Sequence, residues 1–155
     1  MTATEALLVV RGAESEVALG EIDAVLAAVP VSEYRDRLER LREELLGDGL
    51  GAEAVVELDR LIEIALQSGR LRAVYGPGGE AAATRLYRRL PSGRELTASA
   101  KEVAEVLGSL SGQVLDDVAL TVNGPGAFGL SLTVGGREIA VRLDRQGVRL
   151  HSVGV

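Results

Sequence analysis

Three side chains near the end of the sequence are of the types that bind anions. Arg142 and Arg149 carry guanidinium groups, and His151 is the only histidine in the chain. Guanidinium groups bind carboxylates through paired hydrogen bonds, and imidazole can donate, accept or carry charge near neutral pH. His151 has no obvious nucleophile or orienting acid beside it, as general acid–base catalysis would require. These residues therefore predict a ligand-binding surface and no catalytic residue.

A glycine-rich stretch at residues 124–129, Gly-Pro-Gly-Ala-Phe-Gly, has the spacing G-x-G-x-x-G. In a dinucleotide-binding loop this spacing opens a helix, whose N-terminal amides hold the phosphates. Here the residues that follow alternate with period two and predict a strand. Proline at the second position and glycine at the third fit a type II turn. The stretch therefore predicts a hairpin turn, as does Gly-Pro-Gly-Gly at residues 76–79.

The same stretch resembles the glycine-rich loop of protein kinases, and residues 139–142, Ile-Ala-Val-Arg, resemble the strand that carries the kinase lysine. The resemblance covers about twenty residues and departs at Arg142, which stands where the lysine would be. The sequence has no His-Arg-Asp or Asp-Phe-Gly motif, so phosphoryl transfer would have no base and no magnesium ligands.

The composition excludes several classes of functional site. The chain has no cysteine, which excludes disulfides and thiolate sites, and its single histidine excludes multi-histidine metal sites. We predict no cofactor and no metal. The first residues do not resemble a secretory signal, and the uncharged stretch 118–136 is rich in glycine, so we expect a cytoplasmic protein with no membrane contact. Lys101 is the only lysine among many arginines, which indicates a GC-rich, bacterial genome and is compatible with a thermophile.

The 155 residues are expected to form a single compact domain, 1–155, with an acidic helical layer (1–69) and a mildly basic, β-rich part (70–155). Residues 1–69 hold fifteen acids and six arginines, a net of −9, and the remainder has a net of +3. Attraction between the two parts explains this asymmetry most simply, and an anionic partner is the alternative.

Apolar residues at helical spacing predict helices before Pro30, from Ser32 to residue 46, and over residues 54–68, the last two forming an αα-hairpin. Residues 6–10 fit a strand or a helical turn equally. Residues 71–76 and 82–90 are predicted to be strands. Ser99 and Glu102 form a capping box, which predicts an inserted helix beginning there.

After residue 117 the clean alternation predicts a four-stranded antiparallel meander, which gives an α+β fold with N-terminal helices packed on a mainly antiparallel C-terminal sheet. A two-residue turn at 135–136 places Gly129 opposite Arg142. The next turn, taken as Asp144 to Gly147, places Arg142 opposite Arg149 and His151 opposite Ala140. Like charges directly opposite are destabilising, so we expect a nearby carboxylate, or else a bound anion.

A second group of arginines, including Arg85 and Arg89, lies around Tyr87 and is the candidate for contact with nucleic acid. The aromatic residues that stack on single strands are scarce and the net charge is −6, so this partner is possible but not favoured. The leading hypothesis is a non-enzymatic binding or assembly protein that self-associates as a homodimer, or binds a protein partner, through its sheet face or edge. The alternatives are nucleic-acid or phosphate-ligand binding through the arginines, and an enzyme of unknown class. The candidate ligand-binding residues are Arg142, Arg149, His151, Gly129, Arg85 and Arg89.

Overall fold

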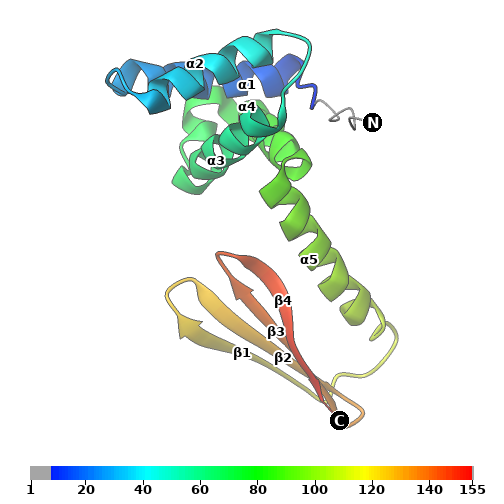
Figure 1. Ribbon diagram of the computed structural model, residues 1–155. Coiled ribbons are helices and arrows are strands. Elements are labelled where there is room, and N and C mark those ends of the chain that lie inside the picture. Colours follow the sequence, from blue (N-terminus) through cyan, green and yellow to red (C-terminus); the bar gives the residue numbers. More distant parts are fainter. Residues whose placement is uncertain (1–7, 155) are drawn as a thin grey trace. The chain divides into compact units, whose positions relative to one another are not determined.

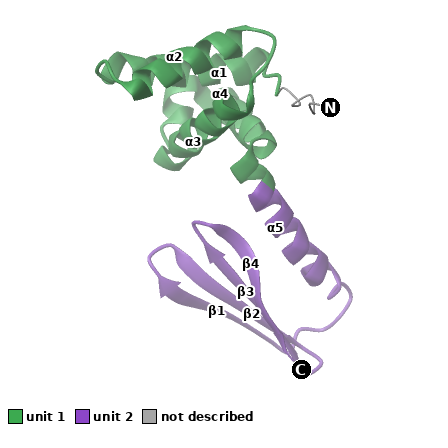
Figure 2. Ribbon diagram, in the orientation of Figure 1, with its two compact units in different colours: residues 1–94 green, residues 95–155 purple. Residues whose placement is uncertain are grey.

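The computed structural model describes residues 8–154 and contains five helices followed by four strands (Figure 1). This confirms the predicted α+β fold with a C-terminal meander. Contacts within the chain group into two compact units, residues 1–94 and 95–155 (Figure 2). The predicted single domain, with the N-terminal helices packed on the sheet, stays a prediction.

Unit 1 is built from four helices and the first residues of a fifth. The helices are α1 (Gly12–Ala28), α2 (Glu33–Leu46), α3 (Ala52–Ser68) and α4 (Leu71–Arg89). The predicted signals for the first three are confirmed. Ser32 caps α2 by accepting a hydrogen bond from the Arg35 amide at 3.3 Å, and α3 ends at Gly69, whose φ of 70° is the left-handed conformation that glycine favours.

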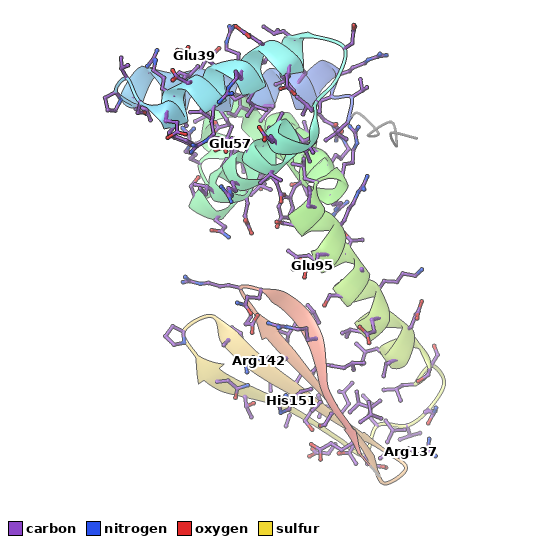
Figure 3. All side chains as sticks on the ribbon, viewed as in Figure 1. Glu39, Glu57, Glu95, Arg137, Arg142 and His151 are labelled. Carbon is purple, nitrogen blue, oxygen red and sulfur yellow. The ribbon has the colours of Figure 1, made fainter. Side chains whose placement is uncertain are left out.

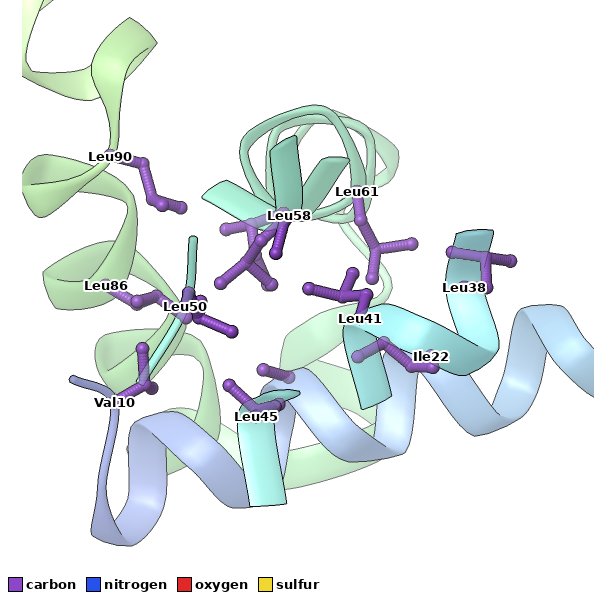
Figure 4. Packing of buried hydrophobic residues seen from close by; sticks show 13 residues of the cluster. Val10, Ile22, Leu38, Leu41, Leu45, Leu50, Leu58, Leu61, Leu86 and Leu90 are labelled. Atoms are coloured by element: carbon purple, nitrogen blue, oxygen red, sulfur yellow. The ribbon is translucent and has the colours of Figure 1, made fainter. Parts of the chain in front are cut away.

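The core of unit 1 is aliphatic, because α1 to α4 each present an apolar stripe and the chain has few aromatic residues (Figure 4). Full burial of one such side chain contributes roughly 2 kcal/mol. Leu8 and Leu50 add an isolated antiparallel bridge, which gives the start of the described chain an extended conformation. Residues 6 and 7 of the ambiguous segment 6–10 lie outside the described residues. The largest fully buried side chains of unit 1 are Ile22, Leu38, Leu41, Leu50, Leu58, Ile62, Leu71, Leu86 and Leu90.

The two strands predicted at 71–76 and 82–90 are wrong, because both segments belong to α4. Gly76 (φ 72°, ψ 179°) interrupts the helix, and Pro77 then begins its second part. Proline suits the first turn of a helix, where its missing N–H is not needed. Buried residues at helical spacing, Ala82, Ala83, Leu86 and Leu90, give the signal that the strand prediction overlooked.

One acid is buried in unit 1 with two partners. Glu21 on α1 is 2 % exposed, accepts a hydrogen bond from the Tyr75 hydroxyl at 2.9 Å and pairs with Arg70 at 2.5 Å. Burial, followed by the Glu21 hydrogen bond, raises the pKa of Tyr75 to about 12. The carboxylate is therefore compensated by a cation and a neutral donor from the region around the start of α4.

The helix α5 (Pro91–Gly108) crosses the boundary between the units, and its later turns belong to unit 2. It begins well before the predicted capping box, so the expected start at Ser99 is wrong. Pro91 opens the helix, and the Ser99 hydroxyl instead donates to the carbonyl of Val148. Val103 of α5 packs against Ile139 and Val141 of the sheet, joined by the less buried Val106, Leu107 and Leu110.

The sheet has the order β1-β2-β3-β4, with strands β1 (Asp117–Gly124), β2 (Ala127–Val134), β3 (Arg137–Asp144) and β4 (Gly147–Gly154). The predicted hairpins are confirmed. Gly126 at the turn between β1 and β2 has a φ of 69°, as the third position of a type II turn requires. Leu132 pairs with Ile139, Gly129 with Arg142, and Arg142 with Arg149, as the turn lengths predict.

Candidate functional site

The polar face of the sheet contains a groove of about 380 Å³. It crosses all four strands, and three of the predicted ligand-binding residues, Gly129, Arg142 and His151, line it; Figure 3 labels the last two. Whether they bind a ligand stays a prediction. The remaining lining residues are Thr121, Asn123, Leu130, Ser131, Ala140 and Val141.

The like charges of Arg142 and Arg149 are bridged by a carboxylate, as the sequence predicts, and that carboxylate is Asp144. Its Oδ2 lies 3.0 Å from Arg142 Nε, and its Oδ1 lies 3.4 Å from a terminal nitrogen of Arg149. The Gln146 backbone amide, followed by the two arginines, lowers the pKa of Asp144 below its ordinary value. The acid comes from the turn between β3 and β4.

His151 lines the groove, but its pairing position on β4 differs from the predicted one. The register of β3 and β4 shifts between Ala140 and Val141, so Ala140 pairs with Ser152. His151 is therefore the extra residue of a β-bulge. The predicted pairing of His151 with Ala140 is therefore wrong, while both residues still line the groove. A bulge depends on local geometry that alternation in sequence does not report.

Gly129 forms the floor of the groove between β1 and β3. A Cβ at this position would lie 2.8 Å from Thr121 Oγ1 and 3.0 Å from Asn123 Nδ2. The Gly129 backbone does not have a positive φ, so the reason for glycine is space. Thr121 and Asn123 were not among the predicted site residues. The pairing of Thr121 with Gly129 was available from the alternation, whereas the irregularity between Val122 and Gly124 hides the position of Asn123.

Arg85 and Arg89, the other predicted ligand-binding residues, lie on α4 in unit 1. Arg89 pairs with Glu14 of α1 at 2.6 Å and donates to the carbonyl of Val9, and Arg85 lies 3.9 Å from the same carboxylate. These contacts support the simpler interpretation of the charge asymmetry. Divided at residue 94, the chain carries −4 in unit 1 and −2 in unit 2, so the arginines after residue 69 mainly offset the acids of the first three helices.

The edge strand β1 exposes an apolar strip on the face opposite the groove. Val118, Leu120 and Val122 are 52 %, 68 % and 76 % exposed, and Phe128, which pairs with Val122, is 40 % exposed. The sequence predicts an apolar inner face here, and that face is covered at β3, where Ile139 and Val141 pack against α5. On β1 the same face remains open within unit 2.

No cluster of three or more acidic or histidine side chains suited to a metal ion occurs in residues 8–154. Over the same residues, no helix has the length and apolar character needed to cross a bilayer. Comparison with protein-family models, with curated proteins and with solved structures finds no match to this chain.

Proposed function

We propose that this chain is a non-enzymatic assembly protein that forms a homodimer by pairing the β1 strands of two copies. The observation that carries the proposal is the exposed apolar strip of Val118, Leu120 and Val122 on an edge strand. Edge strands offer unpaired backbone groups to another strand, and most proteins protect them with charges, proline or bulges. From Val118 to Val122, β1 contains no charged residue, no proline and no register shift.

The sequence of β1 is suited to pairing with itself. In an antiparallel pair centred on Leu120, Val118 would lie opposite Val122 of the second copy, and the two Leu120 side chains would meet. All of these side chains would then be on one face. Asp117 would lie opposite Asn123 of the second copy, which places a carboxylate beside an amide donor and avoids two opposed acids.

The opposite edge of the sheet is less suited to pairing. Strand β4 contains the bulge at His151, and the side chains of Arg149 and His151 are both exposed on the polar face. A bulge and a charged side chain both discourage the addition of another strand. The contrast between the two edges favours β1 as the contact. A cytoplasmic location and a bacterial origin complete the proposal, and the arginine-rich composition is compatible with a thermophile.

Sedimentation velocity over a range of protein concentrations tests the homodimer. The wild-type chain should sediment as a dimer at high concentration and dissociate on dilution. Leu120→Asn removes apolar contact from both copies and should raise the dissociation constant at least about tenfold. Amide exchange in residues 117–124 should also slow as the protein concentration rises.

Val153→Asn is the matched control. Val153 is an exposed apolar residue on β4, 62 % accessible, so its replacement changes the same type of side chain on the other edge. It should leave the dissociation constant unchanged. A wild-type chain that stays monomeric at the highest concentration would overturn the proposal. So would a dimer that Leu120→Asn leaves intact, because the contact would then lie elsewhere.

A further inference from the structure

We propose that the groove on the polar face of the sheet binds the carboxylate group of a small organic molecule. The groove and the apolar strip of β1 lie on opposite faces of the sheet, since strand residues alternate between faces and Thr121 lies between Leu120 and Val122. Pairing of β1 edges would place Asp117 of the second copy opposite Asn123, at the β1 end of the groove, and would leave Arg142 and His151 open. The inference does not need the homodimer and can be tested in the monomer.

Three side chains provide hydrogen-bond donors that are not in use. Arg142 contacts Asp144 through Nε, and over residues 8–154 its two terminal nitrogens have no hydrogen-bond partner. The Asn123 amide and the His151 ring likewise form no hydrogen bond with the part of the chain that is described. These residues come from β1, β3 and β4 and line one groove, so a single ligand can reach all of them.

The space that a side chain at Gly129 would occupy lies between these donors. Glycine in the interior of a strand is destabilising, and a strand glycine often marks the close approach of a ligand or another backbone. Here a Cβ would contact Thr121 and Asn123 from one side, while Arg142 lies directly opposite on β3. The absent side chain therefore keeps open the space between an amide donor and a guanidinium.

The charge around the groove favours a single negative charge. Asp144 carries one negative charge beside the positive charges of Arg142 and Arg149, so these three side chains together have a net charge of +1. None of the residues that line the groove is acidic. Beside its other end, the Ser131 hydroxyl donates to Glu138 at 2.7 Å, which places a carboxylate there. A monoanion bound at Arg142 suits this arrangement, whereas a dianion such as phosphate would meet repulsion from Glu138.

The size of the groove indicates an organic molecule. Its volume of about 380 Å³ falls in the range of small-molecule sites, whereas an ion alone needs far less. The guanidinium of Arg142 can donate two parallel hydrogen bonds to a carboxylate. The rest of the ligand would then lie along the strands.

His151 gives a direct test, because the ring signals of the only histidine can be followed by NMR without assignment. Titration of the wild-type chain with benzoate should shift the His151 ring signals and saturate. Benzamide, which has the same shape and no charge, should leave them unchanged. Inorganic phosphate should bind more weakly than benzoate. The monomeric variant Leu120→Asn should bind benzoate at least as tightly as the wild-type chain does.

Two variants locate the site. Arg142→Gln should weaken benzoate binding by about tenfold, the loss expected when charged hydrogen bonds are removed. Gly129→Ala should weaken it by filling the floor. Arg137→Gln is the control, because Arg137 is a β3 arginine outside the groove. Unchanged His151 signals at saturating benzoate would overturn the proposal. Equal effects of benzamide and benzoate, or of Arg137→Gln and Arg142→Gln, would also overturn it.

Discussion

Arg142 and Arg149 lie directly opposite each other on β3 and β4, and the single carboxylate of Asp144 contacts both. Two guanidinium groups in this position would repel each other if the acid were neutral. Asp144 also accepts a hydrogen bond from the Gln146 amide at 2.8 Å, so the acid holds the turn as well as the arginines. The hairpin of β3 and β4 therefore depends on the charge of one side chain.

Asp144→Asn should lower the melting temperature, because an amide cannot compensate the two arginines. The effect should also depend on pH. A lowered pKa means that the folded state favours the ionised acid, so this stabilisation is complete above the ordinary value of 3.8 and is lost as pH falls through the folded-state pKa. Thermal unfolding measured by circular dichroism from pH 2 to 7 checks this. The wild-type chain and the variant should differ at pH 7 and converge at the acid end.

Replacement of Tyr75 by Phe should change the stability of unit 1 at alkaline pH. A raised pKa means that the folded state favours the neutral phenol, so the stabilisation is complete below the ordinary value of 10.0 and is lost as pH rises through about 12. Burial also raises the pKa of Tyr87, so ionisation of Tyr87 also costs stability at alkaline pH. Tyr75→Phe should therefore remove only part of the loss of stability at alkaline pH. Chemical unfolding between pH 9 and 12 measures the difference. Tyr34→Phe on α2, outside this network, is the control and should retain the full alkaline loss.

Gly93→Ala should destabilise unit 1. An added Cβ would lie 1.9 Å from the carbonyl oxygen of Tyr87, so the ends of α4 and α5 would have to move apart. Overpacking of this type costs about 1–3 kcal/mol. Gly108→Ala provides the comparison, because nothing lies within 4 Å of its Cβ position. It should be neutral or slightly stabilising in urea unfolding. Equal stability of the two variants would contradict the close approach at Gly93.

Asp59→Ala should also weaken the start of α5. Asp59 is 7 % exposed, and its Oδ2 accepts hydrogen bonds from the backbone amide and hydroxyl of Ser92, at 3.1 and 2.7 Å. Removal of the acceptor should cost about 1–3 kcal/mol in the free energy of unfolding. Asp59→Asn keeps an acceptor oxygen and should cost much less. A similar loss for both variants would show that the charge matters more than the hydrogen bonds.

The sequence predicted the hairpins well because their signals are local. Alternation places Gly129 opposite Arg142, and the glycines at 126, 135 and 136 supply the positive φ angles that the turns use. The bulge at His151 interrupts this regularity through packing and backbone geometry that the alternation does not contain. The position of Asn123 was missed for the same reason, since the register between β1 and β2 also shifts beside it.

The helix α4 was missed because one sequence signal has two structural outcomes. Glycine before proline forms a hairpin turn at Gly124-Pro125, whereas at Gly76-Pro77 it interrupts one helix and starts the next segment. The neighbours decide the outcome. Ala82 and Leu86 continue a helical stripe that packs in unit 1, whereas the residues after Pro125 alternate as a strand. Local propensity alone therefore could not separate the two cases.

The bulge at His151 has a consequence for the growth of assemblies. Sheets whose two edges are both regular can add copies without end and form filaments. In this sheet the bulge interrupts β4 at His151, whereas β1 pairs without a register shift from Asp117 to Val122. When two copies join through β1, both remaining outer edges are interrupted ones. Association through this sheet should therefore stop at two copies, which protects a chain with an open apolar edge from fibril formation.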